Sequence, residues 1–192
     1  FEEQTGIPVF DTIEPTFNVV QLFRKHRYLG PDRIADADRL SYGVTSRLID
    51  NDTGQEIITG TLGRTHHFSP QKITLPGQLT GSQNDSDYIA EVALNLRSSW
   101  RLGLENQWDS QTKKTVRSET RIQYRPGPDR LLGLAYRYQN GILKQGDISL
   151  VWPIGQAWRV IAQTSYSLLD RKPLQRHLGW EYTSCCWRLR FM

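Results

Sequence analysis

The chain has 192 residues, of which 38% are hydrophobic, and its 24 Lys plus Arg residues outnumber 20 Asp plus Glu for a net charge of +4. No stretch approaches the roughly 18–20 consecutive apolar residues of a membrane-spanning helix, which excludes that class. A membrane β-barrel stays open, because its strands alternate apolar with polar residues. The basic residues are scattered along the chain, which argues against a nucleic acid partner.

Apolar residues recur with a period of two almost throughout, which predicts β-strands. The first predicted strand is Thr16–Arg24 and the last is Trp187–Phe191, about eleven in all. One side of these strands is apolar and aromatic, and the other carries charge and glycine. The residues predicted on the apolar, lipid-facing side include Leu40, Tyr42, Leu94, Leu104, Leu134 and Trp180.

Turn residues divide the predicted strands, and the connections alternate in length. They are short at 51–54, 97–100, 125–129, 153–156 and 184–186, long near 25–38 and 69–86 and of medium length near 109–116, with further loops around 140–141 and 170–173. Bacterial outer-membrane barrels alternate short periplasmic turns with longer outer loops, and they collect Trp and Tyr near strand ends, as this chain does. The pattern therefore predicts an all-β fold, an antiparallel transmembrane β-barrel.

An odd number of strands with two open edges cannot close in a membrane, because unpaired backbone groups are costly in hydrocarbon. Residues 1–192 are therefore expected to be a fragment of a single larger barrel domain. The alternative is a soluble sandwich or a lipid-binding calyx, in which the same apolar residues would pack into a closed core.

Six arginines on the polar side are predicted to face the barrel lumen and are candidate contacts for anionic groups. They are Arg47, Arg101, Arg121, Arg125, Arg137 and Arg188. Guanidinium groups bind phosphate and carboxylate through paired hydrogen bonds. The interpretation that we favour is a water-filled lumen in which cross-strand acids neutralise these cations. The acids are Glu91, Glu105, Glu119 and Glu181.

No pattern predicts an enzyme, a cofactor or a metal site. His66 and His67 are consecutive, so they point to opposite faces of a strand. His26, Asp32 and Asp36 fall in one predicted outer loop, but no nucleophile with an oriented base accompanies them. An outer-membrane hydrolase is therefore the least favoured function.

Two adjacent cysteines, Cys185 and Cys186, lie on a predicted short turn, which the alternation assigns to the periplasm. That compartment oxidises thiols. A bond between neighbouring cysteines demands a strained ring, and their side chains diverge. If the pair is oxidised, two separate partners are needed, and this chain has no other cysteine.

Four parts of the chain stand out: LFRKHRYLGPDRI at 22–34, LSYGVTSR at 40–47, the residues 124–131 together with YRY at 136–138, and EYTSCCW at 181–187. They resemble the LptD family of lipopolysaccharide-assembly proteins of the Gram-negative outer membrane. The resemblance covers most of the chain from about residue 17 onward.

This resemblance implies the C-terminal part of the barrel, without the amino-terminal periplasmic domain and the final strands. The implied function is insertion of lipopolysaccharide into the outer leaflet of the bacterial outer membrane, by a transporter and not an enzyme. The implied partners are lipopolysaccharide, membrane lipid, a plug lipoprotein (LptE-like), and a periplasmic bridge reached through the missing domain. The resemblance also implies disulfides from Cys185 and Cys186 to cysteines outside this chain. A porin or substrate-specific channel is the alternative.

Overall fold

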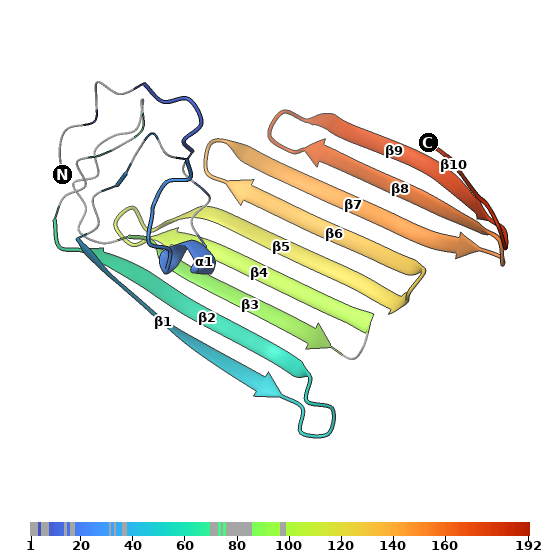
Figure 1. The fold of residues 1–192 in the computed structure, drawn as a ribbon, viewed down its shortest axis with the longest axis horizontal. Helices are drawn as coiled ribbons and strands as arrows, with labels where there is room; N and C mark the ends of the chain where they lie inside the picture. The colour runs from blue at the N-terminus through green and yellow to red at the C-terminus, as the bar shows by residue number, and fades with distance from the viewer. Residues whose placement is uncertain are drawn as a thin grey trace. The chain divides into compact units, whose positions relative to one another are not determined.

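The computed structural model describes residues 4, 8–13, 15, 18–30, 32, 34, 35, 38–69, 73, 75, 86–96 and 99–192. Its secondary structure is one short helix and one ten-stranded sheet, in which each strand lies beside its neighbour in the sequence (Figure 1). The strands are β1 Arg39–Ile49, β2 Glu56–His67, β3 Tyr88–Leu96, β4 Trp100–Asp109, β5 Lys114–Gly127, β6 Arg130–Gln139, β7 Leu143–Ile154, β8 Trp158–Ser167, β9 Lys172–Thr183 and β10 Arg188–Phe191. The predicted all-β class and antiparallel sheet are confirmed.

The contacts between residues divide the chain into two compact units. One contains Phe1–Thr45, Thr61–Ala90 and Gln107–Lys114, and the other contains Ser46–Gly60, Glu91–Asn106 and Thr115–Met192. β1 and β10 stand at the two ends of the strand order, and no pairing between them occurs in the described part of the chain. The sheet is therefore open among the described residues.

The register of the second unit places the predicted apolar residues on one face. Leu134 of β6 lies opposite Ile148 of β7, and Trp180 of β9 lies between Val160 of β8 and Phe191 of β10. Residues directly opposite each other in an antiparallel pair point to the same face. The apolar face is therefore continuous from β5 to β10.

This apolar face is not packed against a second layer. In the second unit Trp180 is 53% exposed, and Leu104 and Leu134 are exposed as well; within the first unit, the predicted lipid-facing residues Leu40 (54%) and Tyr42 are also exposed. Among the described residues, the only buried hydrophobic side chains are Leu22, Tyr28, Ile73 and Ile89. A sandwich or calyx would bury the apolar face in a closed core, so that alternative is wrong for the described residues.

The prediction of a strand over Thr16–Arg24 is wrong, because Val19–Leu22 forms helix α1. The Asn18 side chain accepts a hydrogen bond from Gln21 N at 2.9 Å, which is the usual stabilisation of a helix start. Leu22 is fully buried, and its Cδ2 atom occupies the space that a Cβ atom on Gly63 of β2 would need. Capping and packing therefore outweigh the β-propensity of two consecutive valines, and the sheet has ten strands. No helix in the described part of the chain is long and apolar enough to cross a membrane.

Hydrogen bonds to main-chain carbonyl groups hold the segment around α1 in place within the first unit. The Tyr28 hydroxyl donates to Ile73 O at 3.0 Å. One Arg39 guanidinium nitrogen donates to the carbonyls of Arg24 and Lys25, the latter at 3.3 Å. Leu29 forms an isolated antiparallel bridge with Ile13. The predicted outer loop near 25–38 is therefore an ordered element in its described residues.

The predicted alternation of loop lengths is clear only near the start of the sheet. Connections after odd-numbered strands are 50–55, 97–99, 128–129, 155–157 and 184–187, and those after even-numbered strands are 68–87, 110–113, 140–142 and 168–171. Only 68–87 is much longer than its counterparts. The turn-forming residues Pro126 and Gly127 continue β5, and Pro153 continues β7. Proline and glycine therefore indicate the strand ends less accurately than predicted.

Candidate functional site

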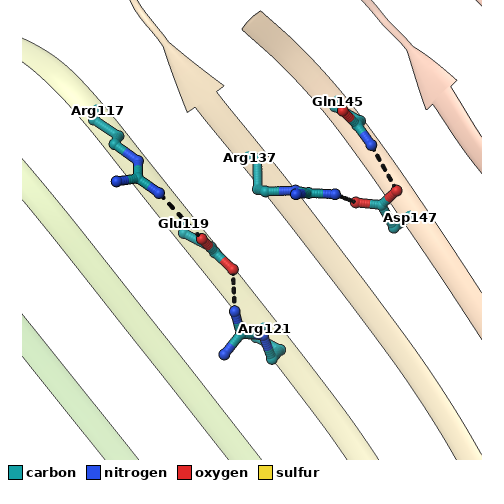
Figure 2. A network of polar contacts seen from close by, with 6 residues as sticks. All are labelled: Arg117, Glu119, Arg121, Arg137, Gln145 and Asp147. Atoms are coloured by element: carbon teal, nitrogen blue, oxygen red, sulfur yellow. Dashed lines mark hydrogen bonds and ion pairs between the residues drawn. The ribbon is translucent and has the colours of Figure 1, made fainter. Parts of the chain in front are cut away.

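The polar face of β5, β6 and β7 carries a network of ion pairs and hydrogen bonds, shown in Figure 2. It has two parts, one along β5 and one between β6 and β7, and the register brings them side by side, since Glu119 of β5 lies directly opposite Arg137 of β6. We call it the central polar network; its members are Arg117, Glu119, Arg121, Arg137, Gln145 and Asp147.

Each carboxylate of the central polar network has at least two side-chain partners. Asp147 pairs with Arg137 Nη2 at 2.7 Å and accepts from Gln145 Nε2 at 2.8 Å. Glu119 pairs with Arg121 and lies 3.6 Å from Arg117 Nη2. A cavity of about 520 Å³ opens beside them, and its other polar lining residues include Gln163 and Ser165 of β8. The network is therefore a polar surface on which two carboxylates partly balance three arginines.

A second cluster lies on the same face at β8, β9 and β10, and we call it the Glu181 cluster: Glu181, Arg159, Arg188 and Arg190. Arg159, Glu181 and Arg190 lie directly opposite one another across the three strands. Glu181 Oε2 accepts from Arg190 Nε at 2.8 Å, while Oε1 pairs with Arg159 and lies 3.4 Å from Arg188 Nε. The Glu181 side chain has no exposed surface. One carboxylate therefore links the last three strands.

The structure distributes the six predicted lumen arginines over several places. Arg121 and Arg137 belong to the central polar network, and Arg188 belongs to the Glu181 cluster. Arg47 lies 3.7 Å from Glu56 across β1 and β2. The other two, Arg101 in β4 and Arg125 near the end of β5, are exposed. The six do not form a single site.

Arg159 and Arg190, which hold Glu181, were not among the site residues predicted from the sequence. A signal for both was present, because Arg159 follows the apolar-face residue Trp158 and Arg190 stands between Leu189 and Phe191. Strict alternation assigns both arginines to the polar face.

The cysteine pair lies at an exposed turn between β9 and β10. The Sγ atoms of Cys185 and Cys186 are 3.1 Å apart, whereas the sulfur atoms of a disulfide are about 2.05 Å apart. Both residues are therefore free thiols. The hydrogen bond between the two thiols lowers the pKa of Cys185 and raises that of Cys186, with Ser184 also lowering the pKa of Cys185. Both thiols are therefore accessible, and Cys185 ionises more readily.

The residues of the predicted outer loop do not assemble a catalytic group among the residues described. The Asp32 carboxylate accepts hydrogen bonds from Phe10 N at 2.9 Å and Asp11 N at 3.0 Å. These backbone amides, Asp11 first, hold the pKa of Asp32 below its ordinary value. His26 is exposed, and Asp36 lies outside the described residues. Asp32 is thus a structural acceptor that closes the segment onto itself.

No group of three His, Cys, Asp or Glu side chains in the described ranges is placed to hold a metal ion. The His66 ring packs edge-on against Phe68, with 5.0 Å between the ring centroids. His67 is buried. The two neighbours therefore lie in different environments, as their positions on opposite faces of β2 require.

Comparison with known proteins gives one family. The family described as LPS transport system D, LptD, matches residues 2–167. The chain is similar to the LPS-assembly protein LptD of Thiobacillus denitrificans, with 36% identity over 190 residues, 99% of this chain and 26% of that protein. It is 35% identical over 192 residues to the protein of the same name from Nitrosococcus oceani, covering 100% of this chain and 26% of that protein. The Xylella fastidiosa relative of that name is 36% identical over 197 residues. The chain thus spans about a quarter of the length of these relatives.

Proposed function

The chain belongs to the LptD family, LPS transport system D, and from that membership we propose that it forms part of the barrel wall of an outer-membrane transporter for lipopolysaccharide. Its relatives are named LPS-assembly proteins. The wall would separate lipid on one side from a water-filled lumen on the other. It would act as a transporter and not as an enzyme.

The observation that carries the proposal is the two-faced single sheet. Large apolar side chains such as Leu134, Ile148 and Trp180 are exposed on one face with no layer against them. Exposed apolar surface of this extent marks contact with a membrane or a partner. The other face carries the central polar network and the Glu181 cluster, which suit water. Alternation of this kind is typical of strands between lipid and an aqueous lumen.

Aromatic clusters near strand ends support the same placement. Trp158, Tyr182 and Trp187 form a chain, with ring centroids 4.8 Å and 5.0 Å apart, at the end of the sheet that carries the cysteine turn. Trp and Tyr are favoured at membrane interfaces because their rings are apolar and their polar tips reach water. We propose that this end lies at the periplasmic interface. The proposed partners are lipopolysaccharide, outer-membrane lipid, a plug lipoprotein and a periplasmic bridge.

We also propose that Cys185 and Cys186 form disulfides to cysteines elsewhere in the full-length protein. Both thiols are exposed on the proposed periplasmic side, where thiols are oxidised. Each would need its own partner, since the pair is not bonded to itself. Two such links would tie this end of the wall to another part of the protein.

A pair of substitutions on adjacent residues tests the membrane placement. Ala162 belongs to the apolar face, opposite Leu150 and Leu178, and Gln163 belongs to the polar face, opposite Ser149 and His177. An arginine on the lipid face near the bilayer midplane costs about 2–4 kcal/mol. Ala162→Arg in the full-length protein should therefore reduce the folded, heat-modifiable fraction on gels, while Gln163→Arg should not. Equal tolerance of the two would contradict the membrane placement.

Depletion of the full-length protein tests the substrate. We expect depletion to reduce surface lipopolysaccharide and the wild-type gene to restore it. Unchanged surface lipopolysaccharide together with lost uptake of small solutes would favour a porin or substrate-specific channel. Turnover of a lipid or peptide by the purified protein would favour a hydrolase.

A further inference from the structure

The cysteine turn, residues 184–187 between β9 and β10, is held at both ends by main-chain hydrogen bonds. Ser184 N donates to Trp187 O at 2.9 Å, across the two cysteines. Thr183 N donates to Ala157 O at 2.8 Å, which ties the end of β9 to the connection after β7. The two thiols are therefore exposed on a turn whose main chain is closed.

Strand β10, which follows the cysteine turn, is short and has little buried surface of its own. It has four residues, and all four are exposed. Its register with β9 consists of four residue pairs, from Arg188 opposite Thr183 to Phe191 opposite Trp180. Segments with few buried contacts and exposed main-chain hydrogen bonds open locally most easily. The position of the cysteine turn therefore depends on the side-chain contacts that hold β10 against β9.

On the polar face, Glu181 joins the two strands on either side of the cysteine turn. Its Oε2 atom is 2.7 Å from Arg190 Nη2, and its Oε1 atom is 3.4 Å from Arg188 Nε. Arg159 of β8 is a third partner of the same carboxylate. The Glu181 side chain has no exposed surface, so water and salt screen these contacts less than they screen a surface ion pair. Glu181 therefore fixes the first strand residue after the turn, Arg188, against β9.

On the apolar face, Trp187 holds the same turn. Trp187 directly follows Cys186, and its ring centroid is 5.0 Å from that of Tyr182 in β9. Tyr182 lies directly opposite Trp158 of β8, with 4.8 Å between the ring centroids. Attractive aromatic pairs have centroids about 4.5–7 Å apart. The cysteine turn is therefore held from both faces of the sheet, by Glu181 on one side and by Trp187 on the other.

We propose that Glu181 and Trp187 are positioning residues for the disulfides of Cys185 and Cys186. This inference rests on the proposed function, because it takes the partners of both thiols to be cysteines elsewhere in the full-length protein. Each pairing joins one thiol of the turn to one distant thiol, and two electrons and two protons pass to a disulfide-containing oxidant, which leaves as a dithiol. A turn held in place raises the effective concentration of each thiol at its partner, since less of the chain remains to be ordered. Neither positioning residue takes part in the transfer of electrons.

The test uses the purified full-length protein in detergent, reduced with dithiothreitol and then supplied with oxidised glutathione. The pairing rate is the rate at which the disulfide-linked form appears on non-reducing gels. Glu181→Gln removes the charge on the polar face, and Trp187→Ala removes the ring on the apolar face. The two variants act on different faces, so either one tests the proposal if the other does not assemble. Glu181→Asp and Trp187→Phe are the conservative variants, which keep the charge and an aromatic ring.

Two substitutions on other strands are the matched controls. Glu119→Gln removes a carboxylate of β5 that also pairs with two arginines on the polar face. Trp100→Ala removes a tryptophan of β4 that stacks on Tyr124, with 4.4 Å between the ring centroids. The rate at which N-ethylmaleimide alkylates the reduced thiols is measured in every variant. This rate reports the reactivity of the thiols themselves, because a small reagent needs no positioned partner.

We expect Glu181→Gln and Trp187→Ala to pair about tenfold more slowly than the wild type, because a small displacement of a reacting group has an effect of this size or larger. The alkylation rate and the heat-modifiable folded fraction should not change. Glu181→Asp and Trp187→Phe should recover most of the pairing rate, and the two control variants should pair like the wild type.

Equal pairing rates in Glu181→Gln, Trp187→Ala and the wild type would overturn the positioning role. A slower pairing rate that only follows a loss of folded protein, or an equal loss of the alkylation rate, would overturn it as well. Failure of the proposed disulfides has a different signature, because the wild type itself would then form no linked species on non-reducing gels.

Discussion

Truncation of Leu22 should release the α1 segment from the sheet. Leu22 is fully buried against Gly63, whose missing side chain makes room for it. Leucine-to-alanine changes at such sites cost about 2–5 kcal/mol. We expect about 2 kcal/mol here, the low end, because a four-residue helix at the surface can settle into the space that the substitution leaves.

Limited trypsin digestion of the full-length protein in detergent measures this release. The cleavage sites are Arg24 and Lys25, whose carbonyl groups accept hydrogen bonds from Arg39 in the docked segment. When opening is fast relative to cleavage, the cleavage rate follows the population of the open form, so about 2 kcal/mol corresponds to about 30-fold faster cleavage in Leu22→Ala. Val20→Ala is the matched control, since Val20 belongs to the same helix and is 74% exposed. Equal cleavage rates in Leu22→Ala, Val20→Ala and wild type would refute the role of Leu22.

Three further outcomes are expected. The backbone amides that donate to Asp32 lower its pKa, so its contribution to closing the segment that contains Phe10 and Asp11 is present above its ordinary pKa of about 3.9 and is lost as pH falls through the lower folded value. Cleavage of this segment by a protease that is active in acid should therefore rise on acidification, and Asp32→Asn should remove that pH dependence. Replacement of Cys185 and Cys186 by Ser in the full-length protein should leave the sheet intact but abolish the mobility shift on non-reducing gels and impair transport; an unchanged gel and normal transport would contradict the disulfides. Glu181→Gln should speed amide hydrogen exchange in β10 about tenfold, because it removes the charge that holds β10 to its neighbours, while Glu119→Gln should leave β10 unchanged.

The sequence by itself determined the strands and their two faces. A period of two needs no tertiary information, because successive side chains on a strand point to opposite faces. Hence the apolar positions Leu134 and Trp180 lie on the exposed face, and Glu119 and Glu181 lie on the polar one. The cysteine pair at the turn between β9 and β10 followed from the same alternation.

Only the tertiary structure decided which residues of the polar face act together. Register fixes the partner of each side chain, and the sequence shows a face but not the register between two strands. Arg159 and Arg190 are 22 and 9 residues from Glu181 in the sequence, on different strands, and both lie directly opposite it in the sheet. For the same reason, the cavity lined by residues of the connections after β5, β7 and β9 forms only when segments that are distant along the chain come together.

Tertiary structure also decided that Val19–Leu22 forms a helix and not a strand. Val19 and Val20 favour a strand by local propensity, and the Asn18 cap is a local signal for a helix. These two local preferences conflict. The burial of Leu22 against Gly63, a residue more than forty positions later, decides for the helix. Local sequence determines an element where its preferences agree, and long-range packing determines it where they do not.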